Sequence, residues 1–293
     1  MKSRFTGIWP ALVTPFRNGE VHPAALRGLI HCFQNAGVSG LVICGTSGEA
    51  ASLSPDERLT VLDTVIECGS GLPLIMGLAG NNLADVLAEL KIVQSRPIAG
   101  VLVPPPYYVR PSQQGIKAFY DAIVQAASVP LILYNIPYRT GVPLELGTIR
   151  ELARYPAVCA IKDCGGDATL TMQLISDGQL DVLAGEDLQI FSTLCLGGSG
   201  AISAAANVRP DLFARMAIAI QAGELAVARQ LLHALRPMIS DLSLEPNPAP
   251  VKAALAELGL IDNELRAPMV KASLNLAASI TRHLNRLEEM DQG

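Results

Sequence analysis

Eight short apolar runs recur along the chain, and they constrain its fold more than any other feature of the sequence. Most begin at glycine or proline and are rich in valine, isoleucine and leucine. They cover residues 7–13, 40–44, 73–78, 100–103, 130–134, 158–162, 180–184 and 200–204. Continuous apolar runs, as opposed to alternating ones, are typical of strands buried on both faces of a parallel sheet. The chain is therefore predicted to contain a large parallel sheet.

Segments with helical periodicity separate these runs. The clearest cover residues 56–66, 83–93 and 113–126, with Ser54 expected as the N-cap of the first, directly before Pro55. Strand and helix alternating eight times predict an α/β fold of the TIM (β/α)8 barrel type. A doubly wound sheet is the main alternative, but no G-x-G-x-x-G motif follows the first run.

The strand–helix repeat stops near Gly223. Residues 1–223 are predicted to form the barrel, and residues 224–293, rich in alanine and leucine, are predicted to be a C-terminal helical extension packed on it. Prolines at 246, 248 and 250 interrupt the extension, because proline ends helices and restricts the residue before it. Since half of the 293 residues are hydrophobic and only 17% are charged, we expect a sizeable core.

Charge and composition disfavour several functional classes. A net charge of −5 argues against a general nucleic-acid surface. No apolar stretch reaches the ~20 residues that span a bilayer, and the N-terminus does not have the pattern of a signal peptide. The six cysteines and four histidines show no metal-ligand spacing, so no metal is expected. Cys44, Cys159 and Cys195 lie in apolar runs and are expected to be buried and reduced, which indicates a cytoplasmic protein.

Lys162 is the residue of these runs that points most directly to chemistry. It lies near the end of an apolar run, between Pro156 and the glycines 165 and 166. A lysine in a buried strand must extend to water, pair with a charge or stay neutral. A neutral, desolvated lysine is a nucleophile that forms Schiff bases with carbonyls. The alternative interpretation is a strand-end lysine that faces solvent.

Three other strand ends carry polar groups that suit the same chemistry. Paired hydroxyls follow the second run, two phenols follow the fourth, a phenol ends the fifth and a guanidinium follows it. These groups are Thr46, Ser47, Tyr107, Tyr108, Tyr134 and Arg139. Each has a structural explanation by itself, as a turn residue, a packing tyrosine or a surface arginine. In a TIM barrel, however, the strand ends gather the reactive groups on one side.

Together with the lysine, these groups predict imine formation with an α-keto acid. The lysine would attack the ketone, while hydroxyls and backbone N–H groups would hold the carboxylate. A tyrosine would shuttle protons, and the arginine would hold the carboxylate of a second substrate. No metal or organic cofactor is required, because the protonated imine itself accepts the electrons.

The chain resembles the dihydrodipicolinate synthase and N-acetylneuraminate lyase family of pyruvate-dependent class I aldolases, and within it the synthases. The resemblance runs from Phe5 to about Pro268. It implies condensation of pyruvate with L-aspartate 4-semialdehyde in the diaminopimelate route to lysine. The motifs that carry it are Gly45-Thr46-Ser47-Gly48-Glu49, Pro106-Tyr107-Tyr108, Tyr134-Asn135-Ile136-Pro137, Arg139-Thr140-Gly141, Ile161-Lys162 and Glu245-Pro246-Asn247-Pro248.

The resemblance implies a catalytic role for four residues. Lys162 would be the Schiff-base lysine, and Tyr134 would be the proton shuttle, linked through Thr46 to Tyr108 of a neighbouring subunit. Because that tyrosine acts across an interface in the family, a homodimer or a homotetramer built as a dimer of dimers is implied.

The resemblance also implies the substrate contacts. Thr46 and Ser47 would hold the carboxylate of pyruvate, with Ser47 standing where threonine is usual. Arg139 would bind the carboxylate of the semialdehyde, which sialate lyases of the family do not need. Backbone around Gly185 and Ile202 would line the pocket.

Two departures from the family pattern keep a second function open. Asp163 and Cys164 replace the usual glutamate and alanine after the lysine, and Tyr138 precedes Arg139 where a small residue is usual. We expect the ring of Tyr138 to narrow or reshape the entrance for the second substrate. The alternative is another pyruvate or 2-keto acid aldolase that acts on a sugar acid or other aldehyde. A non-catalytic relative is disfavoured by the intact set of reactive groups.

A possible allosteric lysine site is also implied by the resemblance, at Ala51, Asn81, Asp85 and Tyr107. Two of its usual features are changed. Pro55 and Arg58 stand where feedback-sensitive enzymes often have histidines, and aspartate replaces glutamate at position 85. Weak or absent inhibition by lysine is therefore expected.

Overall fold

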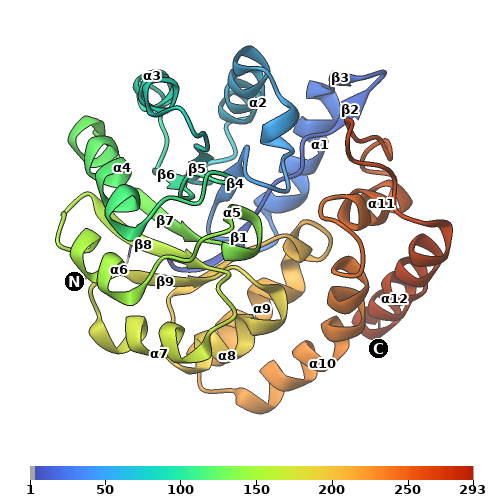
Figure 1. Cartoon of the computed structure of the whole chain (residues 1–293). Coiled ribbons are helices and arrows are strands. Elements are labelled where there is room, and N and C mark those ends of the chain that lie inside the picture. The colour runs from blue at the N-terminus through green and yellow to red at the C-terminus, as the bar shows by residue number, and fades with distance from the viewer. Residues whose placement is uncertain (1–3, 293) are drawn as a thin grey trace. The chain divides into compact units, whose positions relative to one another are not determined.

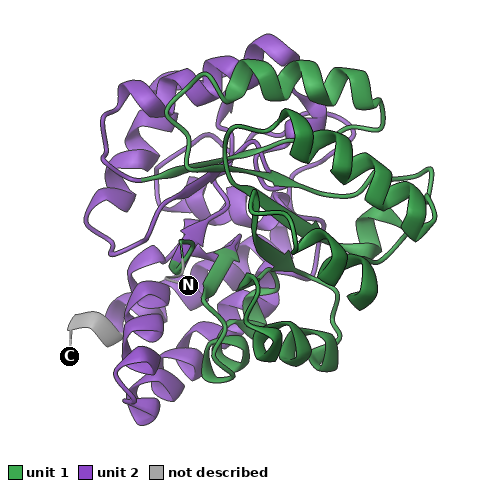
Figure 2. Ribbon diagram, turned by 90° about the vertical axis from the view of Figure 1, so that its left-hand side faces the viewer, with its two compact units in different colours: residues 1–7, 73–202 green, residues 8–72, 203–293 purple. Residues whose placement is uncertain are grey.

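The structure is a computed structural model that describes residues 4–292. It divides into two compact units (Figure 2). The first unit is Met1–Gly7 with Pro73–Ile202, and the second is Ile8–Leu72 with Ser203–Gly293. The predicted boundary between residues 223 and 224 does not coincide with the boundaries of these units, and it stays a prediction.

Parallel strands joined by helices make up the first unit. In sequence order its strands are β5 (Leu74–Gly77), β6 (Gly100–Val103), β7 (Leu131–Asn135), β8 (Val158–Asp163), β9 (Asp181–Ala184) and β10 (Gly200–Ser203). Each pairs in parallel with the next along the chain. The helices between them are α3 (Leu83–Val93), α4 (Gln113–Ala126), α5 (Pro137–Thr140), α6 (Leu146–Leu152), α7 (Ala168–Asp177), η2 (Asp187–Gln189) and α8 (Ile190–Cys195).

The second unit combines the chain's first strands with its last helices. Its strands are β1 (Gly7–Pro10), β4 (Leu41–Ile43) and a hairpin of β2 (Phe16–Arg17) and β3 (Glu20–Val21). Its helices are α1 (Pro23–Gln34), η1 (Ala50–Ser52), α2 (Pro55–Glu67), η3 (Ala205–Asn207), α9 (Pro210–Gln221), α10 (Leu225–Leu242), α11 (Ala249–Glu257) and α12 (Leu274–Gln292).

The order of the strands is that of a TIM barrel. In the first unit the sheet runs β10-β9-β8-β7-β6-β5, and in the second Ala11, directly after β1, bridges in parallel to Val42 of β4. Eight parallel strands with surrounding helices, followed by the helices α10 to α12, confirm the predicted fold class (Figure 1).

Sequence predicted the elements better than their ends. Every apolar run contains a strand, residues 83–93 and 113–126 are helices, and α10 and α11 are separated around the predicted prolines. Ser54 caps α2 in a capping box with Glu57, as its position before Pro55 indicates. The hairpin of β2 and β3 was not predicted, because strands of two residues are too short to show a periodic pattern.

The prediction that Cys44, Cys159 and Cys195 are buried is correct only for Cys44. Cys159 is partly exposed and Cys195 is exposed. Cys195 is the last residue of α8, a short helix that buries Ile190, Thr193 and Leu194 and leaves its end in solvent. No disulfide joins the six cysteines, all of which lie within the described residues.

None of the helices within residues 4–292 has the length and apolar character needed to cross a membrane. That part of the chain also holds no group of three or more histidine, cysteine, aspartate or glutamate residues arranged to bind a metal ion.

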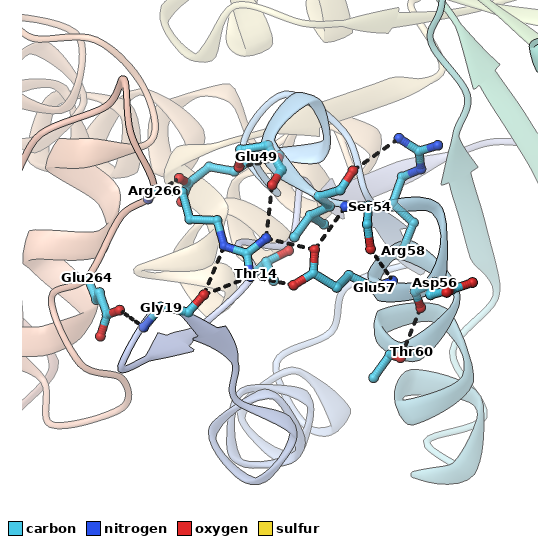
Figure 3. A network of polar contacts seen from close by, with 12 residues as sticks. Thr14, Gly19, Glu49, Ser54, Asp56, Glu57, Arg58, Thr60, Glu264 and Arg266 are labelled. Carbon is cyan, nitrogen blue, oxygen red and sulfur yellow. Dashed lines mark hydrogen bonds and ion pairs between the residues drawn. The ribbon is translucent and has the colours of Figure 1, made fainter.

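Arg266 anchors the start of α2 within the second unit (Figure 3). Its guanidinium binds the carboxylate of Glu57 in two-point fashion, with Nη1 2.7 Å from Oε2, and also donates to the carbonyl oxygens of Gly19 and Ser52. The hydrogen bond from Arg266 lowers the pKa of Glu57 from 4.5 to about 2. An ionised Glu57 therefore stabilises the folded state.

We expect Glu57→Gln to lower the free energy of unfolding by about 2 kcal/mol at pH 7, the scale of a charge-assisted hydrogen bond. Because the folded-state pKa is depressed, this contribution is present above pH 4.5 and is lost as the pH falls toward about 2. Denaturant unfolding of both proteins between pH 7 and pH 3 should show the difference shrinking. A difference that stays constant over this range would contradict the assignment.

Candidate active site

Lys162 and Tyr134 form a buried pair on adjacent strands of the first unit. The register of β7 and β8 pairs their Cα atoms directly, and side chains at one level of neighbouring strands leave the same face. The Nζ of Lys162 donates to the Oη of Tyr134 at 3.2 Å and lies 4.4 Å from the centre of its ring. Both residues are buried, with 7% of Lys162 and 5% of Tyr134 exposed. The interpretation of Lys162 as a solvent-facing lysine is therefore wrong.

Asp163 fixes the strand ends that carry this pair. Its buried carboxylate accepts hydrogen bonds from the side-chain amide of Asn135, the N–H of Gly165 and the hydroxyl of Thr171, at 2.9, 2.9 and 2.6 Å. Asn135 in turn accepts from the N–H of Leu144 at 3.0 Å. In the sequence, Asp163 stands out only as a departure from the family pattern. Asn135 and Asp163 come directly after Tyr134 and Lys162, and this matching position was a signal that the two polar side chains bond each other.

Gly185 lies against the aliphatic part of Lys162. Its N–H donates to the carbonyl oxygen of Asp163 at 2.9 Å. A Cβ atom at this position would lie 2.9 Å from Cε of Lys162 and 2.1 Å from Sγ of Cys164, so only glycine fits. Ile202, which is fully buried, follows Ala201, and Ala201 pairs with Ala184 directly before Gly185. Gly185 thus directly follows β9, which pairs with the strand of Lys162, and Ile202 lies on β10, one strand further along the sheet.

Cys164 is an unreactive neighbour of the amine. Its thiol is buried, and burial raises its pKa to about 12. A thiol of this kind stays protonated near neutral pH and is a poor nucleophile. The sulfur is therefore a weaker candidate nucleophile than the amine.

Arg139 and Tyr138 extend from α5, directly after β7. Arg139 is exposed, and its guanidinium carbon lies 5.7 Å from the centre of the Tyr138 ring. The hydroxyl of Tyr138 donates to Oε1 of Glu186, the residue after Gly185, at 3.1 Å, and partial burial raises the pKa of Tyr138. The link between Tyr138 and Glu186 was missed, because it joins residues 48 positions apart.

Thr46 and Ser47 lie in the second unit, in a turn that follows β4. Ser47 is buried, and its Oγ accepts a hydrogen bond from Nδ2 of Asn247 at 3.0 Å. The carbonyl oxygen of Thr46 accepts from the N–H of Glu49 at 3.1 Å. The structure therefore brings Ser47 together with the Glu245–Pro248 motif of the extension, a contact that sequence analysis did not predict.

Tyr108 lies in the loop after β6. It is 88% exposed and has a positive φ of 69°, which is unusual for a residue other than glycine. Arg110, with φ of 49°, donates from Nε to the carbonyl oxygen of Gly141 at 3.0 Å and so ties the loop to the end of α5. Tyr108 is thus presented to solvent by a tethered loop.

The residues of the possible lysine site are all exposed. Asn81, Asp85 and Tyr107 lie in the first unit, and Ala51 lies in η1 of the second. A lysine site at these positions stays a prediction.

The geometry of the first unit supports one kind of chemistry. A buried amine hydrogen-bonded to a phenol can attack a carbonyl and pass protons through the phenol. The pair lies at the carboxyl ends of two barrel strands, where catalytic groups of this fold gather. Fold and pair together fit the Schiff-base-forming class I aldolases.

The chain belongs to the Dihydrodipicolinate synthetase family, which it matches over residues 4–287. It is 37% identical over 291 residues to the 4-hydroxy-tetrahydrodipicolinate synthase of Methanosarcina mazei, covering 98% of this chain and all of that protein. The dihydrodipicolinate synthase of Acinetobacter baumannii, solved in complex with pyruvate, superposes with a TM-score of 0.93 at 32% identity over 97% of this chain and 99% of that one. A monomeric dihydrodipicolinate synthase variant matches with a TM-score of 0.93 at 33% identity over 97% of each chain. The family predicted from the sequence is confirmed.

Proposed function

We propose that this protein is a 4-hydroxy-tetrahydrodipicolinate synthase, which condenses pyruvate with L-aspartate 4-semialdehyde on the diaminopimelate route to lysine. The observation that carries the proposal is the 3.2 Å hydrogen bond between Lys162 and Tyr134 in a buried site. The name of the Methanosarcina mazei relative and the pyruvate complex of the Acinetobacter baumannii protein support it.

The proposed reaction starts at the amine of Lys162. The nitrogen adds to the ketone carbon of pyruvate, and water leaves as the protonated imine forms. Loss of a proton from the methyl group gives an enamine, whose carbon attacks the aldehyde of the second substrate. Tyr134 lies within hydrogen-bond reach of the nitrogen and would carry protons between these steps. The protonated imine accepts the electrons, so the steps need neither a metal nor an organic cofactor.

The other proposed roles follow the family. Thr46 and Ser47 would hold the carboxylate of pyruvate, and Gly185 and Ile202 would line the pocket beside Lys162. The close approach of Gly185 to Cε of the lysine supports its role, because a larger residue would displace the amine.

A coupled assay with pyruvate and a panel of aldehydes tests the proposal. Turnover with aspartate semialdehyde on the order of 10 per second would support it. The ring of Tyr138, which lies near Arg139 and whose hydroxyl donates to Glu186, favours keeping the second candidate, an aldolase for a sugar acid or another aldehyde. Turnover with such an aldehyde, and none with the semialdehyde, would favour that candidate instead.

Arg139→Ala is expected to raise KM for the semialdehyde by about 10- to 100-fold and KM for pyruvate much less, because a charge-assisted contact with only one substrate is lost. Steady-state kinetics with each substrate varied in turn measures both constants. Arg150→Ala is the matched control, since Arg150 is an exposed arginine paired with Asp177. Equal changes in both constants would indicate a structural role for Arg139.

L-Lysine is expected to inhibit weakly or not at all, because Pro55 and Arg58 replace the histidines common in feedback-sensitive enzymes. A steady-state assay titrated with lysine up to millimolar concentration measures this. Half-inhibition at micromolar lysine would show that the exposed residues Asn81, Asp85 and Tyr107 still form an effective site.

We also propose a homodimer or a dimer of dimers in the cytoplasm. The exposed, tethered Tyr108 supports a role across a subunit interface. The alternative is a monomer, the state named for one synthase variant among the solved structures. Sedimentation of the protein at micromolar concentration separates the two.

A further inference from the structure

The turn that carries Thr46 and Ser47 has an unfavourable backbone. Cys44 and Glu49, on either side of it, adopt the left-handed conformation with φ of 52° and 53°. At Gly48 a side chain would lie 3.1 Å from the carbonyl oxygen of Leu12, so the turn is also tightly packed. Residues other than glycine keep such a conformation only where the surrounding structure holds them.

A buried ion pair holds the C-terminal side of this turn. The carboxylate of Glu49 lies 2.5 Å from Nζ of Lys252, and both side chains are almost completely buried. Its second oxygen accepts the backbone N–H of Arg266 at 3.1 Å, and Figure 3 shows Glu49 beside Arg266. Glu49 is therefore fixed at both oxygens by residues of the C-terminal extension.

Lys252 is itself held in place by two further contacts. Its Nζ donates to the carbonyl oxygen of Glu264 at 2.8 Å and lies 4.1 Å from the centre of the Phe16 ring. It is the only lysine or arginine in α11, and it is fully buried. Either partner of such a pair would be left as an uncompensated buried charge without the other, so the two stay together in the folded protein.

We propose that Lys252 is a positioning residue, which acts through Glu49 to hold the Thr46–Ser47 turn in the conformation that binds the carboxylate of the keto acid. The inference rests on the proposed function, which assigns that binding role to Thr46 and Ser47. By this proposal, α11 contributes to pyruvate binding, and the C-terminal extension has a role in the site as well as in packing.

Lys252→Met tests this role, because methionine keeps the apolar stem of lysine and removes the charge. Borohydride trapping at increasing pyruvate concentration gives the half-saturating concentration without the second substrate. We expect that concentration, and KM for pyruvate, to rise about tenfold or more, while KM for the semialdehyde changes less than about threefold. The double variant Lys252→Met/Glu49→Gln leaves no buried charge unpaired and should show the same rise if the single variant folds poorly.

Glu57→Gln is the matched control. It weakens the same polar network at Arg266 without touching the side chain of Glu49. We expect it to lower the unfolding midpoint and leave the pyruvate half-saturation unchanged. An equal shift in Glu57→Gln, or wild-type half-saturation in both Lys252 variants, would overturn the positioning role. Absence of any pyruvate adduct on the wild-type protein would instead overturn the proposed function itself.

Discussion

Lys162→Ala is expected to lower turnover by a factor on the order of 10⁴ or more, the effect of removing a covalent nucleophile. Lys162 is the only lysine in the eight strands of the large sheet. Its neighbour Cys164 cannot replace it, because burial raises the pKa of that thiol to about 12. We therefore expect no second nucleophile to rescue the reaction, and single-turnover kinetics should show no fast phase.

Borohydride trapping identifies the nucleophile directly. Reduction of the wild-type protein with pyruvate should add a stable adduct to the peptide that contains Lys162, as seen by peptide mass mapping. Lys117→Ala is the control, since Lys117 is a partly exposed lysine paired with Glu151 on the neighbouring helix. It should keep both turnover and adduct. An adduct on another lysine, or turnover retained in Lys162→Ala, would refute the imine at Lys162.

The sequence was sufficient to predict the fold and the central pair, because both depend on local signals. Eight apolar runs predicted eight strands, and a lysine in one of them, with a tyrosine in the run before it, predicted a reactive pair. The register of β7 and β8 brings Tyr134 opposite Lys162, which follows from each residue's place at the end of its strand.

What could not be predicted depends on contacts between distant parts of the chain. The hydrogen bond from Tyr138 to Glu186 spans 48 positions, and the one from Asn247 to Ser47 spans 200. The ion pair of Glu49 with Lys252 could not be predicted from the sequence for a different reason. Lys252 lies in an alanine-rich helix, where a lone lysine is normally exposed. Only the packing of that helix reveals it as buried.

Asp163 shows how a departure from a family pattern can be structural. Its carboxylate accepts three hydrogen bonds and ties the ends of β7 and β8 to α7 through Thr171. An aspartate with these partners holds the strand end that carries Lys162. We expect any effect of Asp163 on the reaction to act through the placement of the amine.

Tyr134→Phe is expected to lower turnover by about 100-fold or more while the protein stays folded, because it removes a proton-transfer group and keeps the buried ring. The ring lies 4.4 Å from Nζ of Lys162, so phenylalanine preserves the packing around the amine, while the 3.2 Å hydrogen bond to the amine is lost. Trapping with pyruvate and borohydride should still label Lys162, but more slowly. Steady-state turnover and the rate of trapping measure the two effects separately.

Tyr120→Phe separates this effect from the loss of any buried hydroxyl. Tyr120 is fully buried, donates to the carbonyl oxygen of Val103 at 2.8 Å and also hydrogen-bonds to the backbone of Tyr134, so Tyr120→Phe removes a buried hydroxyl of the first unit while the phenol of Tyr134 stays in place. That change should lower stability by about 1 kcal/mol and leave turnover near the wild-type value. Near-normal turnover in Tyr134→Phe would mean that another group carries the proton. A slow Tyr134→Phe variant beside an active Tyr120→Phe variant would instead assign the proton transfer to the hydroxyl that contacts the amine.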